Sequence, residues 1–377
     1  MSKSKGNVVD PIPLIQMHGA DAVRYSLAAN AAPAREIRMS EEEVKRAGAL
    51  IVKVWNAARF VATHGATPDA LQKFGGSVSV VEWDGRGVNS LDGRWVVNSL
   101  RRAALDVAHA LEESRFDEAG SAVFNAARRV LCDKFIEGCR PLLMNGETDQ
   151  KKEEVEEARL VLSWSMSMVL RLLHPMMPFV TETLWDKLGF KADAATTLVM
   201  SSWPDLPPSP EYSQAEREME VVFAVVAQLR NAIATHSLGS PRTLQLSVDG
   251  ASKEQMLAIH RHAGVASVTA ATTHDSQGVE GGDMELVVGG VTVRVGRADV
   301  DQGRGVDVEA ERNRVNKLLA KTSTGVLKLH KTLHSPGFLE RAAPDMIDKV
   351  KTKLATLEEQ QRSLMATLER LESRDDE

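Results

Sequence analysis

The chain has 377 residues, of which 43% are hydrophobic and 26% are charged, and 46 basic against 52 acidic side chains leave a formal charge of −6. This composition excludes wholesale disorder, and no apolar run approaches the ~18–20 residues that cross a bilayer, so we expect a soluble, cytoplasmic protein. At roughly 100–200 residues per domain, the length predicts two to four domains. The two cysteines, Cys132 and Cys139, provide neither a disulfide framework nor a zinc site, and no histidine spacing predicts another metal.

The first residues are a short run of hydroxyl and ammonium side chains, Ser2, Lys3, Ser4 and Lys5, followed by a Gly-Asn pair. Flexible lysines on such a loop can approach a polyphosphate and neutralise the charge that develops on a leaving pyrophosphate. Taken by itself, the run is better explained as a solvated terminus.

A bundle of long helices is expected next, before a proline-rich linker at 203–210. Apolar spacing predicts helices over roughly 40–64, 93–115, 117–144 and 150–187, and near-parallel helices with short connections form bundles. Ser40 and Glu43 have the spacing of a capping box at the start of the first helix. Two prolines predict a break at Leu173–His174 in the fourth. The apolar stripe of the first helix is Val44, Ala47, Ile51, Val54, Ala58 and Val61.

A smaller α/β domain is expected after the linker. Its predicted elements are helices over 214–235 and 253–262 and strands over 244–248, 265–270, 284–288 and 291–295. Gly289-Gly290, between the last two strands, predicts a two-residue hairpin.

The tail has the heptad spacing of a coiled coil. Apolar residues recur at intervals of three and four from Ile347 to Leu371, with one polar member, and a weaker seam over 308–329 precedes Ser335-Pro336-Gly337. We therefore expect an antiparallel helical hairpin. No acid lies between Arg312 and His334, where the six basic residues are Arg312, Arg314, Lys317, Lys321, Lys328 and Lys331.

This basic strip has two interpretations of equal weight. A strip of cations on a rod suits phosphate contacts along an RNA backbone. It equally suits a solvated coiled-coil face that pairs with acids of the other helix, Glu358, Glu359, Glu369 and Glu372.

Several motifs together resemble class I aminoacyl-tRNA synthetases. Met1–Ser4 is similar to the KMSKS signature loop without its leading Lys. Residues 54–61, 132–137, 173–185 and 203–204 resemble the anticodon-binding bundle of the valine enzyme and its isoleucine and leucine relatives. The terminal hairpin and residues 333–344 resemble the coiled-coil arm of valyl-tRNA synthetases, whereas the Cys-rich zinc module that usually ends the isoleucine enzyme lacks its ligands here.

The resemblance implies a mainly α fold in four parts. These are the KMSKS loop and end of a catalytic domain (1–39), an anticodon-binding helical bundle (40–205), a small α/β linker domain (206–305) and a coiled-coil tRNA-binding arm (306–377). It implies the C-terminal tRNA-binding portion of a valine–tRNA ligase, an ATP-dependent enzyme, without the Rossmann and editing domains. In the complete enzyme ATP would be used with Mg²⁺, whereas this chain alone is expected to bind no cofactor and to be inactive.

The resemblance also assigns roles to residues. Lys3 would act in catalysis with Ser2 and Ser4 shaping the loop, and Lys3 and Lys5 would contact the ATP phosphates. The partners would be tRNA-Val, whose outer corner the basic strip of the arm would contact, and the missing N-terminal part. Because unpaired anticodon bases are read by stacking and edge hydrogen bonds, the candidates in the bundle are Trp55, Asn56, Arg59, Arg101, Arg102, Arg128 and Arg129.

We expect Trp164 and Trp185 to lie in the core and His174 to pack at the helix break. Two other functions are compatible with the same sequence. One is a non-catalytic tRNA- or RNA-binding paralogue, and the other is the corresponding part of an isoleucyl-type synthetase. A third and weaker alternative is a coiled-coil scaffold without RNA affinity.

Overall fold

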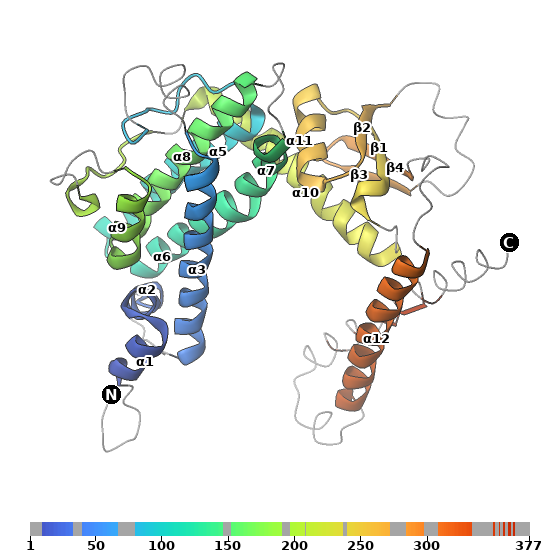
Figure 1. The fold of residues 1–377 in the computed structure, drawn as a ribbon, viewed down its shortest axis with the longest axis horizontal. Coiled ribbons are helices and arrows are strands. Elements are labelled where there is room, and N and C mark those ends of the chain that lie inside the picture. The colour runs from blue at the N-terminus through green and yellow to red at the C-terminus, as the bar shows by residue number, and fades with distance from the viewer. Residues whose placement is uncertain are drawn as a thin grey trace. The chain divides into compact units, whose positions relative to one another are not determined.

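The computed structural model describes residues 10–32, 40–66, 80–145, 152–190, 197–207, 209–236, 240–271, 284–297 and 308–333, and seven separate positions between 350 and 365. The described residues are mostly helical, with one four-stranded sheet, which confirms the mainly α fold (Figure 1). The chain divides into two compact units, Met1–Glu220 and Val221–Glu377. Within the described ranges, no helix has both the length and the apolar character needed to cross a membrane.

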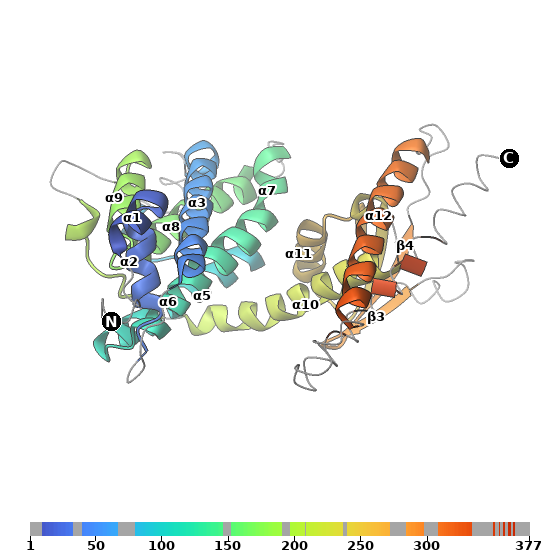
Figure 2. The same ribbon diagram turned by 90° about the horizontal axis from the view of Figure 1, so that it is seen from below.

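The first unit consists mainly of helices (Figure 2). Their buried apolar side chains form its core. The helices are α1 (Pro11–His18), α2 (Ala20–Ala29), α3 (Glu41–His64), α5 (Leu91–Glu112), α6 (Phe116–Phe124), the π-helical stretch η3 (Asn125–Phe135), α7 (Ile136–Asn145), α8 (Lys152–Leu173), α9 (Pro178–Lys187) and the short 3₁₀ helices η5 (Leu198–Met200) and η6 (Pro210–Tyr212).

Two predicted helix boundaries are confirmed, the start of the first bundle helix at Ser40 and the break in the fourth after Leu173. The Ser40 hydroxyl accepts a hydrogen bond from the Glu43 N–H, and the Glu43 carboxylate accepts one from the Ser40 N–H, so the capping box is present. The fourth predicted helix breaks after Leu173, as expected from Pro175 and Pro178. His174 packs at this break, with its Nδ1 2.8 Å from the Thr181 hydroxyl.

Two details of the helices differ from the predictions. On α3 the buried stripe includes Leu50, whereas Ile51 is only half-buried, because the buried face is rotated slightly from the predicted one. The predicted 117–144 helix contains the π-helical stretch η3. The spacing of hydrophobic residues does not reveal the wider turn of this stretch.

The core is centred on α8, in which every residue from Leu160 to Leu173 is buried. A helix that is apolar on nearly all sides belongs in an interior. Trp164 and Trp185 are 0% and 2% exposed, which confirms both as core residues. The Trp164 ring meets Trp83 edge to face at 5.9 Å between centroids, and its Nε1 donates to the Trp83 carbonyl at 2.8 Å.

The second unit contains a four-stranded sheet in the order β2-β1-β4-β3. The strands β1 and β2 are parallel and are connected through α11, whereas β4 is antiparallel to both β1 and β3. The predicted hairpin is confirmed, since Val288 pairs with Val291 across Gly289 and Gly290, both with positive φ. The elements are α10 (Ser213–His236, which begins in the first unit), η7 (Pro241–Thr243), β1 (Leu244–Asp249), α11 (Lys253–Ala263), β2 (Ser267–Ala270), β3 (Met284–Val288) and β4 (Val291–Arg297).

The first helix of the predicted hairpin is α12 (Val308–Leu333). Ser323 accepts a hydrogen bond from the Gln361 amide at 3.0 Å, and His330 Nε2 lies 2.9 Å from the Glu358 carboxylate. Since the later residue of α12 meets the earlier residue of the following segment, the two segments run in opposite directions. Most of the heptad seam from Ile347 to Leu371 lies outside the described residues, so the coiled coil stays a prediction.

Candidate nucleic-acid interface

The loop with Ser2, Lys3, Ser4 and Lys5 lies outside the described residues, but the helices that follow it are firmly attached to the bundle. The Asp21 carboxylate on α2 accepts hydrogen bonds from the backbone N–H groups of Phe179 at 3.2 Å and Val180 at 2.6 Å. These donors belong to the first turn of α9, where a carboxylate is favourable. The Tyr25 hydroxyl donates to the Gly120 carbonyl at 2.8 Å, and burial raises the pKa of Tyr25 to about 12.

The predicted residues on α3 lie on its accessible side. Asn56 and Arg59 are exposed and Trp55 is half-buried. Lys53, one turn earlier, forms an ion pair with Asp133 of η3, and Arg128 Nε lies 3.8 Å from the same carboxylate. The structure therefore brings Lys53 of α3 and Arg128 of η3 to the same carboxylate, although the two residues are about seventy-five positions apart.

An aromatic and cationic cluster next to these residues was not predicted. Phe60 is half-buried on α3, and the Arg140 guanidinium of α7 lies 5.2 Å from the centroid of its ring. His64, one turn further, has its ring centroid 4.6 Å from that of Phe60. Aromatic and guanidinium planes are the groups on which unpaired bases stack. The i,i+4 spacing of Phe60 and His64 was a visible signal, but Arg140 joins them only through the tertiary fold.

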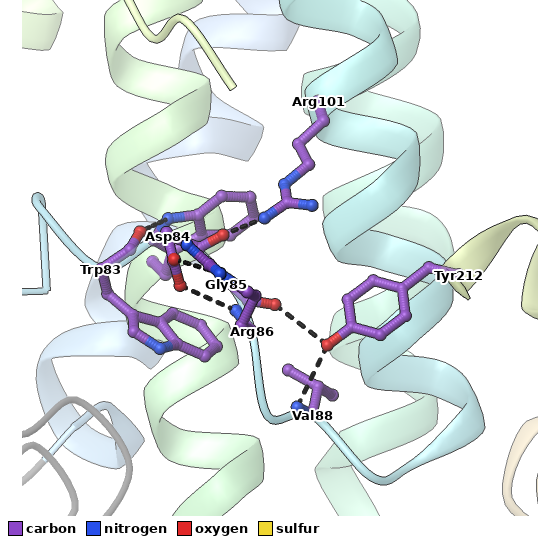
Figure 3. Close-up of polar contacts among 8 residues, drawn as sticks. Trp83, Asp84, Gly85, Arg86, Val88, Arg101 and Tyr212 are labelled. Atoms are coloured by element: carbon purple, nitrogen blue, oxygen red, sulfur yellow. Dashed lines mark hydrogen bonds and ion pairs between the residues drawn. The ribbon is translucent and has the colours of Figure 1, made fainter. Parts of the chain in front are cut away.

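Arg101 is not available for RNA contacts, which corrects its selection as a candidate. It is 5% exposed, and its guanidinium donates to the Asp84 carbonyl within the connection from α3 to α5 (Figure 3). The same connection is bound by Tyr212, whose hydroxyl donates to the Gly85 carbonyl at 3.2 Å. The sequence does not indicate this, because adjacent residues on a helix point about 100° apart, and their order alone does not say whether one of two arginines faces the core.

The remaining predicted arginines of the bundle are accessible to different degrees. Arg102 is exposed and forms an ion pair with Glu216 at 2.6 Å. Arg128 is half-buried, with its guanidinium 5.6 Å from the centroid of the Phe124 ring. Arg129 is exposed.

Lys134 lies in the last turn of η3. Its ammonium is 5.6 Å from the centroid of the Trp95 ring on α5. Burial lowers the pKa of Lys134, and the Glu220 carboxylate opposes this shift. The ammonium therefore makes a cation–π contact with Trp95.

On α12, Lys328 and Lys331 are exposed. Arg312, Arg314, Lys317 and Lys321 belong to the same helix, but their side chains lie outside the described set. The contact between His330 and Glu358 shows that at least one acid of the second segment pairs with this helix. These contacts therefore do not decide between the two interpretations of the basic strip, phosphate contact with RNA and pairing with acids of the second segment.

The described residues contain no group of three or more His, Cys, Asp or Glu side chains that could hold a metal ion. Cys132 and Cys139 are both buried, and burial raises the pKa of the Cys132 thiol to about 12. These cysteines are therefore core residues.

Comparison with known families gives three matches along the chain. Residues 1–40 match the class I tRNA synthetases (I, L, M and V), residues 93–248 match the anticodon-binding domain of tRNA ligase, and residues 307–372 match the valyl tRNA synthetase tRNA binding arm.

Curated relatives match almost the whole chain. The valine–tRNA ligase of Caulobacter vibrioides is 31% identical over 376 residues, which are 99% of this chain and 39% of that protein. The valine–tRNA ligase of Geobacter sulfurreducens is 31% identical over 378 residues, which are 98% of this chain and 40% of that protein. A solved ternary complex of a LeuRS from Agrobacterium radiobacter K84 with tRNA and LeuAMS has 23% identity and a TM-score of 0.41, covering 57% of this chain and 23% of that one.

The chain is thus a relative of the valine–tRNA ligases and corresponds to their C-terminal part, with the anticodon-binding domain and the tRNA-binding arm. It spans about two fifths of the length of the relatives that it matches.

Proposed function

We propose that this chain is the tRNA-binding portion of a valine–tRNA ligase, which attaches valine to tRNA-Val at the expense of ATP. The observation that carries the proposal is the match of residues 307–372 to the valyl tRNA synthetase tRNA binding arm, within a similarity that extends over 99% of the chain. Attachment of valine to the tRNA would also need the portion that the relatives contain and this chain does not span.

In this proposal the bundle binds the anticodon through the accessible side of α3, where Arg140 of α7 meets Phe60. Phe60, with Arg140 and His64 around it, supplies planes for base stacking, and Asn56 supplies a donor and an acceptor for base edges. Arg59 is exposed beside them and suits a phosphate. Arg102, Arg128 and Arg129 remain candidates, whereas Arg101 is left out because it is buried.

The arm contributes phosphate contacts at the outer corner of the tRNA. A net charge of −6 repels a polyanion, so binding must come from local excess of cations. The stretch from Arg312 to His334 has such an excess, and its exposed members include Lys328 and Lys331. Contacts of this type give affinity that falls steeply as salt concentration rises.

The N-terminal loop would act only in the complete enzyme. Lys3 and Lys5 would neutralise charge on the ATP phosphates, and Lys3 would stabilise the leaving pyrophosphate with Ser2 and Ser4 shaping the loop. ATP, with Mg²⁺, would supply the energy of adenylate formation. Because α1 and α2 are held by the bundle, the loop would be attached to a rigid base.

The proposal is tested by titrating the purified chain with tRNA-Val and with a tRNA-Val whose anticodon is replaced. We expect at least tenfold weaker binding of the altered tRNA, because only the contacts of the bundle are lost. Equal affinity for both would contradict anticodon recognition. No measurable affinity for tRNA-Val at low salt would contradict the whole proposal.

A further inference from the structure

The π-helical stretch η3 brings together two side chains that an α-helix would separate. Arg128 and Asp133 are five positions apart, and Arg128 Nε lies 3.8 Å from the Asp133 carboxylate. In an α-helix, with 3.6 residues per turn, side chains five positions apart point about 140° away from each other. In a π-helix the backbone hydrogen bonds join residues five apart, so such side chains lie on the same side. The backbone of η3 therefore places the Arg128 guanidinium beside the Asp133 carboxylate.

The Arg128 guanidinium is held from two sides. Its Cζ lies 5.6 Å from the centroid of the Phe124 ring, one turn earlier in the chain. The Asp133 carboxylate on its other side is itself fixed, because it forms an ion pair with Lys53 of α3. The side chain of Arg128 is nevertheless 43% exposed. A planar cation is therefore kept in one position with part of its surface accessible to a ligand.

This cluster lies on the same two helices as the contact between Phe60 and Arg140. α3 packs against η3, which continues into α7, and the ion pair of Lys53 with Asp133 is followed seven positions later on both helices by that contact. Seven residues of an α-helix rise about 10 Å, which is about the height of three stacked bases in one strand. One unpaired segment of a few nucleotides can therefore reach both places.

The charges along this pair of helices favour a polyanion. The Asp133 carboxylate is shared by two cations, and the Glu137 carboxylate lies 3.1 Å from the Arg140 guanidinium. Together these contacts join three cations, Lys53, Arg128 and Arg140, to two carboxylates, Asp133 and Glu137. One positive charge is left over on a chain whose formal charge is −6, and a local excess of this kind attracts RNA.

We propose that the Arg128 guanidinium, resting on the Phe124 ring, is a second stacking platform for an unpaired RNA base, separate from the platform at Phe60. Aromatic and guanidinium planes are the groups on which such bases stack. Asp133 is a positioning residue, which acts through Arg128. The stretch lies within residues 93–248, which match the anticodon-binding domain of tRNA ligase. The inference rests on the proposed function, since it takes RNA to be the ligand of this surface.

Arg128→Lys tests the platform because it keeps the positive charge and removes the plane. Binding of tRNA-Val to the purified chain should become at least fivefold weaker, whereas the slope of log affinity against log salt should stay the same. Arg46→Lys is the matched control, since the side chain of Arg46 is 70% exposed on α3 and its guanidinium lies 3.8 Å from the Glu43 carboxylate. This control should bind as tightly as the unchanged chain.

Asp133→Asn separates positioning from charge, because the two roles predict effects of opposite sign. Removing a carboxylate makes the surface more positive, which by charge alone would tighten RNA binding. If Asp133 holds Arg128 in place, the variant should instead bind tRNA-Val at least threefold more weakly. Combined with Arg128→Lys, it should cause little further loss, since the group that it positions is already gone.

Chemical probing of the bases in bound tRNA-Val locates the platform, at protein concentrations that saturate each variant. Arg128→Lys should expose a base that stays protected in Phe60→Ala. Unchanged affinity of Arg128→Lys, tighter binding by Asp133→Asn, or exposure of the same base in both probed variants would overturn the inference. Any of these results with normal binding by the unchanged chain would leave the proposed function intact. No binding by the unchanged chain would count against both.

Discussion

The helical bundle and the arm use basic residues in opposite ways. In the bundle, several guanidinium and ammonium groups serve the fold itself: Arg101 is buried against a backbone carbonyl, and Arg102 and Lys53 pair with carboxylates. On α12, by contrast, Val326 is the only buried residue among those whose side chains are described, and the exposed lysines follow one another along the helix. The bundle can hold a few groups in fixed positions for specific contacts. The arm can offer charge over a long distance with little core of its own.

The largest expected effect concerns the core of the bundle, compared with an exposed position on α12. Trp164→Ala should lower the free energy of unfolding of the bundle by about 3–5 kcal/mol, because it leaves a cavity and an unpaired Trp83 carbonyl. Leu327→Ala on α12, which removes a 69% exposed side chain, should change stability by less than about 0.5 kcal/mol. Urea unfolding followed by circular dichroism measures both. Equal losses would mean that Trp164 contributes no more to stability than an exposed side chain.

The next effect concerns base stacking in the bundle. Phe60→Ala should weaken binding of tRNA-Val by about 1–3 kcal/mol, which is about 5- to 150-fold, because it removes the stacking plane. The salt dependence of binding should stay the same, since no charge is lost. Phe116→Ala is the matched control, because Phe116 is 40% exposed on α6 and is not part of the proposed site. A similar loss in both variants would reject the stacking role.

For the arm we expect the reverse, a changed salt dependence of binding with unchanged discrimination between anticodons. Lys328→Glu with Lys331→Glu should reduce the slope of log affinity against log salt by about two, because each lysine contributes about one phosphate contact. Discrimination between anticodons should stay unchanged. Lys253→Glu, at the exposed start of α11, serves as a control for net charge. If Lys253→Glu reduces the slope as much per lysine as the changes on α12 do, the effect comes from overall charge and the arm has no particular role.

The smallest effect is a pH dependence confined to the bundle. Burial lowers the pKa of His174, so the folded state favours the neutral imidazole. The corresponding stability is present above the unfolded pKa of about 6.5 and is lost as pH falls through the lower folded value. Thermal unfolding at pH 7 and pH 5 should therefore show a smaller difference for His174→Gln than for the unchanged chain. His109→Gln, with a 63% exposed side chain, should leave this difference as it is.

Much of the fold was predictable from the sequence because local signals define it. The capping box at Ser40, the helix break before Pro175 and the hairpin at Gly289-Gly290 each depend on residues within a few positions of one another. The π-helical stretch η3 was not predictable, since apolar spacing does not distinguish one wider turn within a long helix.

The candidate site was less accessible to prediction because tertiary contacts assemble it. Arg59 was found through a local motif, but the neighbouring pair of Phe60 and Arg140 spans eighty residues. Arg101 and Arg102 are adjacent and chemically identical, yet only the fold decides that one is buried and the other exposed.

The most direct test of the account is hydroxyl-radical footprinting of tRNA-Val bound to the purified chain. If the bundle reads the anticodon and the arm holds the outer corner, two separate regions of the RNA should be protected, and raising the salt concentration should weaken protection of the corner first. Protection of neither region, or uniform protection along the whole RNA, would contradict the division of roles between bundle and arm.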